Sequence, residues 1–182
     1  MTAEAPEGFR YVPDFLGQEE ETALLDHVRS LEYESVEMRG QVARRRVVHF
    51  GWRYGYESWR IEPAPPIPKA FDELRARAAA LIAAAEDELA EVIVTEYPPG
   101  AAIGWHRDAP QFGIVVGVSL LSACRMRFQR GTGATRETRA TELAPRSAYV
   151  LAGEVRWAWQ HTLPATKATR YSITFRTLRA AG

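Results

Sequence analysis

The feature that most constrains this chain is the succession of short β-forming runs in its second half. From residue 91 onward six such runs follow one another, with turns but no helix-length segment between them: EVIVTEY, AAIGWH, GIVVGVSL, CRMRFQ, SAYVLAG and TRYSITFRTL. Parallel strands would need crossover connections of roughly a dozen or more residues, usually helical. The pattern therefore predicts an antiparallel sandwich or barrel.

The first half of the chain carries the helical signals. Residues 18–31 have apolar side chains at helical spacing and acids in the first turn, where the helix dipole favours them. Residues 68–89 open on a proline and continue alanine-rich, which predicts a second helix. The arginine- and aromatic-rich segment between them is typical of hairpin and loop. The expected fold class is α+β and mainly β, with two helices of the N-terminal half packed on a β core.

Length and composition limit the class of protein. A chain of 182 residues, 46% of them hydrophobic, is expected to form one compact domain. It contains no run of about 18 uncharged apolar residues, and its N-terminal MTAEAPEGF lacks the basic and apolar regions of a signal peptide. The single cysteine, Cys124, cannot form an internal disulfide. We therefore expect a soluble, cytoplasmic monomer with no membrane association and no protein partner.

Charge is distributed unevenly although the formal net charge is zero. Residues 1–90 contain 11 Lys/Arg and 17 Asp/Glu, a balance of −6, whereas residues 91–182 contain 12 and 6, a balance of +6. Residues 39–60 hold six arginines and a single acid, Glu57. A local basic patch of this kind attracts phosphate backbones, although a solvated charged surface would have the same composition.

The sequence GWHRDAP holds the first candidate site. In a strand, His106 and Asp108 would project to one face about 6.6 Å apart at the backbone and could bind one cation, with Arg107 pointing away. A kinase HRD loop is excluded, because the chain has no glycine-rich phosphate loop, strand lysine or downstream metal-binding asparagine in place. His161, at the end of a predicted strand, completes a 2-His-1-carboxylate set that suits non-haem Fe(II) or catalytic zinc. Alternatively, His161 is an ordinary, partly buried histidine.

The segment RYSITFR points to an anionic ligand. Its period of two places Arg170, Ser172, Thr174 and Arg176 on one face and the apolar side chains on the other. Two arginines directed into a small barrel would cost several kcal/mol without carboxylate partners, and a dicarboxylate cosubstrate would supply them. The alternative is an edge strand whose arginines face solvent.

HxD, the distal histidine and RYSITFR together resemble the AlkB family of Fe(II)/2-oxoglutarate-dependent dioxygenases. The family pattern is HxD, a distant His and then Arg-x5-Arg, and all five positions match. The resemblance covers roughly residues 90–178 well and the N-terminal half loosely. It implies a single domain over residues 1–182, whose β core at residues 91–178 is a double-stranded β-helix, or jelly roll.

The resemblance also implies cofactors and chemistry. Fe(II) would bind the His-Asp-His set, O2 would be the oxidant, and 2-oxoglutarate would be decarboxylated to succinate while a substrate C–H bond is oxidised. Arg170 would pair with the C5 carboxylate of 2-oxoglutarate, Tyr97 would add a hydrogen bond, and Arg176 would lie near the C1 carboxylate or Asp108. The family's usual asparagine two residues before the tyrosine is Thr95 here, so one amide contact is missing or replaced.

The expected substrate is an N-alkylated base in DNA or RNA, whose methyl group would leave as formaldehyde after oxidation. Residues 36–62 resemble the family's nucleotide-recognition lid and combine arginines with stackable rings. The candidate contacts are Arg45, Arg46, His49, Phe50, Trp52, Tyr54, Tyr56 and Trp59.

The substrate prediction has two alternatives. The acidic residues that often follow HxD in nucleic-acid demethylases are absent, because Ala109, Pro110 and Gln111 occupy that stretch. The second hypothesis is therefore the same oxygenase chemistry on a protein side chain or a small metabolite. The third is a non-catalytic β-barrel binding module with a structural metal site, although such a site has no need of a dicarboxylate clamp.

Overall fold

The computed structural model describes residues 5–38, 40–55 and 57–179. Its strands are β1 (Phe9–Val12), β2 (Glu34–Met38), β3 (Gln41–Phe50), β4 (Trp52–Gly55), β5 (Arg60–Pro63), β6 (Leu89–Tyr97), β7 (Ile103–His106), β8 (Phe112–Leu120), β9 (Cys124–Arg130), β10 (Glu137–Leu143), β11 (Ala148–Leu151), β12 (Gln160–Leu163) and β13 (Arg170–Leu178). Its α-helices are α1 (Gln18–Arg29), α2 (Asp72–Leu81) and α3 (Gly153–Trp157), and its short 3-10 helices are η1 (Lys69–Phe71), η2 (Glu86–Glu88) and η3 (Gly133–Thr135). Within these ranges, none of the helices has the length and apolar character needed to cross a membrane.

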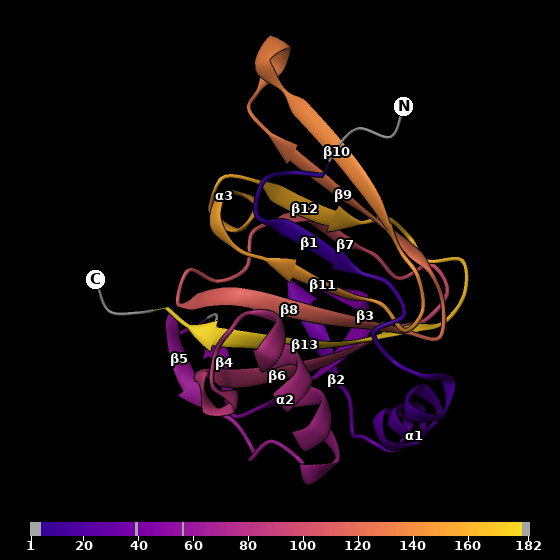
Figure 1. The fold of residues 1–182 in the computed structure, drawn as a ribbon. Helices are drawn as coiled ribbons and strands as arrows, with labels where there is room; N and C mark the ends of the chain where they lie inside the picture. The colour runs from indigo at the N-terminus through magenta and orange to yellow at the C-terminus, as the bar shows by residue number, and fades with distance from the viewer. Residues whose placement is uncertain (1–4, 39, 56, 180–182) are drawn as a thin grey trace.

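The strands form two facing sheets and a separate two-stranded hairpin. The larger sheet has the order β1-β11-β8-β13-β6-β3-β2, and the smaller sheet has the order β10-β9-β12-β7. Neighbouring strands in both sheets run antiparallel. In Figure 1 the smaller sheet lies above the larger one, while α1 and α2 lie below. The predicted antiparallel sandwich with two helices packed on it is confirmed.

The helices cover the outer face of the larger sheet because each turns an apolar stripe toward it. Val28 of α1 and Leu74 of α2 are buried in one cluster with Ile173 of β13. Burying a side chain of this size contributes about 1.5–3 kcal/mol. The helix α1 begins at the predicted residue, and its first turn is stabilised by the Glu20 carboxylate, which accepts a hydrogen bond from the Gly17 N–H at 2.7 Å.

The second helix is shorter than predicted, which corrects the expectation of a helix over residues 68–89. The helix α2 ends at Leu81, and Ala83 has a positive φ of 52° that a helix cannot contain. Strand β6 begins at Leu89, which is fully buried and pairs with Thr177 of β13. Helix propensity is a weak preference for each residue, and the β ladder and burial at Leu89 override it.

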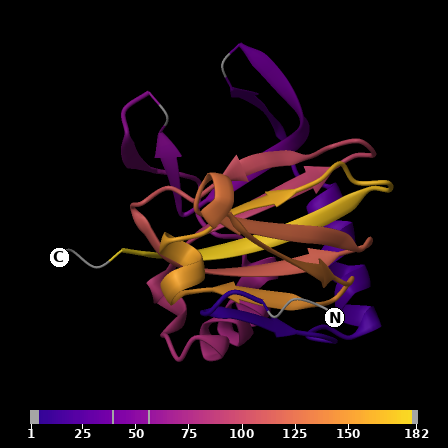
Figure 2. The ribbon, with the colours of Figure 1, turned by 90° about the horizontal axis from the view of Figure 1, so that it is seen from above.

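Two hairpins stand out from the sandwich on one side, as Figure 2 shows. In the first, β2 pairs with β3, and β3 joins the larger sheet beside β6. In the second, β4 pairs with β5. These hairpins contain nearly all of residues 36–62, the predicted lid.

A second apolar cluster joins the two sheets, and a cavity lies beside it. Met126 and Phe128 of the smaller sheet are buried together with Tyr97 and Val115 of the larger one. The cavity, called the main cavity below, has a volume of about 530 Å³ and walls from both sheets and both hairpins. It is the place where the predicted site residues can meet.

Candidate metal and cosubstrate site

The floor of the main cavity is the inner face of the larger sheet, and strand pairing decides which side chains meet there. The partners across the β13–β6 ladder are Arg170 and Tyr97, Ser172 and Thr95, Thr174 and Ile93, and Arg176 and Glu91. All of these side chains line the cavity. The apolar residues of RYSITFR point the other way, into the cluster between the larger sheet and the helices, as the alternation predicts.

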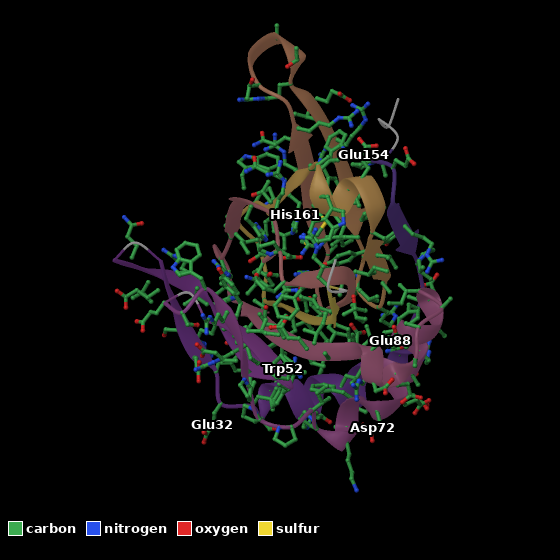
Figure 3. The ribbon with its side chains drawn as sticks, turned by 90° about the vertical axis from the view of Figure 1, so that its left-hand side faces the viewer. Glu32, Trp52, Asp72, Glu88, Glu154 and His161 are labelled. Atoms are coloured by element: carbon green, nitrogen blue, oxygen red, sulfur yellow. The ribbon has the colours of Figure 1, made fainter. Side chains whose placement is uncertain are left out.

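Strands β7 and β12 of the smaller sheet bring the two histidines together. His161 pairs with His106 in the antiparallel ladder, and their ring centroids are 4.3 Å apart. Asp108 follows two residues after His106, and its Oδ1 lies 3.8 Å from His106 Nε2. One donor atom from each of the three residues lies within 4.8 Å of the others. Figure 3 labels His161, which lies in the interior of the sandwich.

The surroundings keep these three side chains in the protonation state that binds a metal. The Gly104 carbonyl accepts a hydrogen bond from His106 Nδ1 at 2.8 Å, which leaves Nε2 as the ligand atom. Burial lowers the pKa of His161 to about 4 and also lowers the pKa of His106. Burial opposes ionisation of Asp108, but Arg176 and then the two histidines hold its pKa well below its usual range. At neutral pH the set therefore consists of two neutral imidazoles and a carboxylate.

Arg176 connects Asp108 to a second carboxylate that is fully buried. One terminal nitrogen of Arg176 donates to Glu91 Oε2 at 2.9 Å, and the other donates to Asp108 Oδ1 at 3.0 Å. His49 Nδ1 lies 3.1 Å from the other Glu91 oxygen. Burial opposes the charged form of Arg176, but the carboxylates of Asp108 and Glu91 raise its pKa overall. This bridge fixes the orientation of the Asp108 carboxylate.

Arg170 is a buried cation with two unsatisfied nitrogens. Its side chain is 1% exposed, its Nε donates to Ser119 Oγ at 3.0 Å, and its guanidinium carbon lies 5.1 Å from the centroid of the Tyr97 ring. Both terminal nitrogens are buried and have no hydrogen-bond partner among the described residues. A guanidinium binds a carboxylate through two parallel hydrogen bonds, so this geometry fits a carboxylate ligand.

The main cavity therefore suits a metal ion and a dicarboxylate together. His106, Asp108 and His161 form the two-imidazole, one-carboxylate set that is typical of non-haem Fe(II) sites with open coordination positions. Arg170 faces the same cavity as these three residues. Glu91 is already paired with Arg176, so it does not compete for Arg170.

Alternation along β3 decides which predicted substrate contacts reach the main cavity. Arg45 and His49 lie on its inner face and line the cavity, as does Tyr54 of β4. Arg46 and Phe50 lie on the opposite face of β3. Arg46 forms an ion pair with a glutamate of β6, and Phe50 packs in the cluster beneath the helices. The structure therefore brings three of these five residues to the cavity.

The other predicted lid aromatics lie away from the cavity or outside the described residues. Trp52 is half-buried but does not line the main cavity. Trp59 is 74% exposed in the turn between β4 and β5, and its carbonyl accepts a hydrogen bond from Gln111 Nε2 at 3.2 Å. Tyr56 lies outside the described residues.

Three features of the site were not predicted from the sequence. Glu91 shares the alternation of EVIVTEY with Thr95, so the signal for its inward position was present. Arg156 of α3 is buried and donates to backbone carbonyls of residues 109–113, a role with no signal in the sequence. Arg107 lines the cavity although it was expected to point away, because β7 ends at His106 and strand alternation stops there.

Comparison with known proteins relates most of the chain to one family. A family model described as the 2OG-Fe(II) oxygenase superfamily matches residues 8–176. An uncharacterized protein of Acanthamoeba polyphaga mimivirus is 28% identical over 184 residues, which cover 93% of this chain and 84% of that protein.

Two further relatives are longer proteins. The Mus musculus tRNA (carboxymethyluridine(34)-5-O)-methyltransferase ALKBH8 is 29% identical over 171 residues, which cover 89% of this chain and 25% of the relative. The Arabidopsis thaliana alkylated DNA repair protein ALKBH8 homolog is 26% identical over 188 residues, which cover 88% of this chain and 51% of the relative. The chain thus spans between a quarter and about half of these two proteins.

Solved structures share the fold over nearly the whole chain. The structure of OsALKBH1 has a TM-score of 0.75 at 14% identity and covers 96% of this chain and 98% of its own. A Pseudomonas putida prolyl-4-hydroxylase has a TM-score of 0.67 at 16% identity, over 96% of this chain and 94% of the hydroxylase chain. At such identities the likeness concerns the fold alone, and it confirms the jelly-roll core expected from the sequence.

Proposed function

This chain belongs to the 2OG-Fe(II) oxygenase superfamily, as an AlkB-like enzyme that uses Fe(II), 2-oxoglutarate and O2, and we propose that it removes alkyl groups from nitrogen atoms of bases in DNA or RNA. Residues 36–62 act as the lid of a single domain, over the β core of residues 91–178. The observation that carries the proposal is the buried Arg170, whose two terminal nitrogens lack a protein partner and face the same cavity as the His-Asp-His set. A structural metal site would need no such arginine.

We assign the iron to His106, Asp108 and His161. Bound Fe(II) would supply the site at which O2 is reduced while 2-oxoglutarate is decarboxylated to succinate. The hydrogen bond from His106 Nδ1 to the Gly104 carbonyl leaves Nε2 as the atom that would bind the metal, and Arg176 holds Asp108 ionised. The protein thereby sets ligand orientation before the cofactors arrive.

We assign the C5 carboxylate of 2-oxoglutarate to Arg170. Ser119 and the Tyr97 ring fix the guanidinium, so its two terminal nitrogens have a defined direction before a carboxylate binds. Thr95 stands opposite Ser172 on the cavity floor, where its hydroxyl takes the place of the asparagine amide that is usual in the family. Because Arg170 is 1% exposed, little water would reach a pair between its guanidinium and a bound carboxylate, which would strengthen that pair.

The walls of the main cavity support an alkylated base as the substrate. Four glutamates of the two hairpins face it: Glu34, Glu37, Glu57 and Glu62. A base that is alkylated on a ring nitrogen can carry positive charge, which nearby carboxylates stabilise. Tyr54 offers a ring on which the base can stack, and Arg45 offers a cation for its phosphate. The names of the mouse and plant relatives, which concern tRNA and alkylated DNA, agree with this substrate class.

The test is a turnover assay with purified protein, Fe(II), 2-oxoglutarate, O2 and ascorbate. Succinate and formaldehyde are measured with and without N-methylated oligonucleotides of DNA and RNA. Formaldehyde that requires the oligonucleotide is expected, and both products should vanish in His161→Ala and Arg170→Met. Arg125→Ala, at an exposed arginine of β9 that does not line the cavity, serves as the matched control.

Two results would contradict the proposal at different levels. Succinate without formaldehyde on any oligonucleotide would keep the oxygenase and reject the nucleic-acid substrate in favour of a protein side chain or a metabolite. Full activity in His161→Ala or Arg170→Met would reject the residue assignments.

A further inference from the structure

A second cavity adjoins the main cavity next to Asp108. It has a volume of about 330 Å³, and it shares Tyr54, Arg107, Asp108 and Ala109 with the main cavity. Trp157, the last residue of α3, forms another part of its wall. We propose that this second cavity binds the nucleotide next to the alkylated base in a single strand of nucleic acid. This inference rests on the proposed function, which puts the alkylated base in the main cavity.

The shared wall allows one ligand to occupy both cavities. Because four residues line both, a substrate that reaches Asp108 in the main cavity also borders the second one. Ligand sites commonly have volumes of roughly 300–1,000 Å³. At about 330 Å³ the second cavity is large enough for one ring with its attachments. Two adjacent nucleotides of one nucleic-acid strand, which are covalently linked, fit this arrangement of two adjoining cavities.

The wall of the second cavity offers an indole that contacts two guanidinium groups. Trp157 is 42% exposed, so part of its indole is accessible to a ligand. The guanidinium carbons of Arg156 and Arg179 lie 4.3 Å and 4.9 Å from the centroid of its ring. Arg156 is fixed by its hydrogen bonds to backbone carbonyls of residues 109–113, so it holds the indole in place. Unpaired bases stack on aromatic rings and on guanidinium planes of this kind.

The charge around the second cavity favours a phosphodiester. Arg107 and Arg156 line it, and Arg179 lies against Trp157. Asp108 is the one carboxylate among its described lining residues, and that carboxylate is already paired with an arginine at 3.0 Å. Arg107 donates to the backbone carbonyl at residue 158 at 3.1 Å, which uses one of its five N–H donors. The exposed side chains of Arg107 and Arg179 are therefore placed to contact the phosphate of the neighbouring nucleotide.

The experiment compares one N-methylated base in two contexts, a mononucleotide and a trinucleotide with one neighbour on each side. The quantity measured is the ratio of kcat/KM for the trinucleotide to that for the mononucleotide, from formaldehyde release. We expect the wild-type ratio to be well above one and to fall roughly 5- to 150-fold in Trp157→Ala, the equivalent of one base–aromatic stack. Trp157→Phe should retain most of the ratio. Because every variant is compared with itself, a general loss of folding or iron binding cancels.

Two controls and a binding measurement accompany this ratio. Trp105→Ala removes a tryptophan of similar exposure, 37%, that lines neither cavity, and it should leave the ratio unchanged. Fluorescence anisotropy of a labelled trinucleotide without iron reports binding independently of turnover. Arg107→Ala should lower the salt dependence of this binding, with a slope smaller by about one, whereas Arg125→Ala should not.

The outcomes separate the inference from the function on which it rests. If mononucleotides release formaldehyde but the ratio is near one, or survives Trp157→Ala, the second cavity is not a nucleotide site and the proposed function stands. If no methylated nucleotide of either length releases formaldehyde, both are rejected. A methylated peptide whose turnover depends on Trp157 would assign the second cavity to a protein substrate and overturn the inference.

Discussion

Replacing Arg170 with methionine is expected to stabilise the free protein while abolishing its response to 2-oxoglutarate. The guanidinium is 1% exposed, and its two terminal nitrogens have no hydrogen-bond partner among the described residues. Burying an ion without full compensation costs several kcal/mol in real proteins. Here the contact with the Tyr97 ring offsets about 2 kcal/mol of this cost, and the hydrogen bond to Ser119 offsets about 1 kcal/mol.

These contributions leave a net cost of about 1–2 kcal/mol, which methionine would remove because it has a similar volume and no charge. For a chain of this size, 1 kcal/mol corresponds to a change in Tm of about 2–4 °C, so Arg170→Met should raise Tm by roughly 2–8 °C. In the wild type, 2-oxoglutarate at about 100 times its Kd should add about 2.7 kcal/mol of stability. In the variant that addition should be absent.

The assay is thermal unfolding under anaerobic conditions with Fe(II), with and without 2-oxoglutarate. Arg125→Met is the matched control, since an exposed arginine of β9 should change stability by no more than about 0.5 kcal/mol and keep the shift. The reasoning is refuted if Arg170→Met is less stable than the wild type without 2-oxoglutarate and yet keeps the full shift with it.

Three further predictions concern the walls of the main cavity. Glu91→Ala removes one of the two carboxylates of Arg176 and should lower the free energy of unfolding by about 3 kcal/mol in urea, whereas Glu91→Gln should lose about 1 kcal/mol; equal losses would contradict the charge argument. Burial lowers the pKa of His161 to about 4, so as pH falls the unfolded chain binds a proton at this histidine before the folded chain does. The metal-free protein should therefore keep its full stability above pH 6.5 and lose about 3 kcal/mol between pH 6.5 and pH 4. His161→Gln should flatten that dependence in urea unfolding. Gly117→Ala would place a Cβ 2.2 Å from the Tyr149 ring and should destabilise the protein by about 1–3 kcal/mol in thermal unfolding, while an unchanged Tm would show that the ring can move aside.

Much of the site could be predicted because it lies in strands with a strict period of two. RYSITFR fixes which side chains of β13 share a face, and HxD fixes two donors of the metal set from neighbouring residues. The third donor, His161, is 55 positions from His106, and only the pairing of β12 with β7 brings it into place. The sequence could therefore suggest the three ligands, but only the antiparallel pairing of β12 with β7 brings them close enough to bind one ion.

The lid shows where the same reasoning reaches its limit. Alternation along RRRVVHF predicts two groups of side chains but does not say which group faces the cavity. The phase is set by the pairing of β3 with β6 and by the apolar cluster beneath the helices, which takes Phe50. Arg46 is directed away with it, and Arg45 and His49 face inward.

What the sequence determined by itself is local: the strand-rich second half, the first helix, the metal-donor spacing of HxD and the polar face of RYSITFR. These follow from the chemistry and spacing of neighbouring residues, which a chain carries wherever it folds. Tertiary structure alone decided the end of the second helix, the burial of Glu91 between Arg176 and His49, and the second cavity beside Trp157. Each of these depends on packing between segments far apart in sequence, where burial and long-range pairing outweigh local preference.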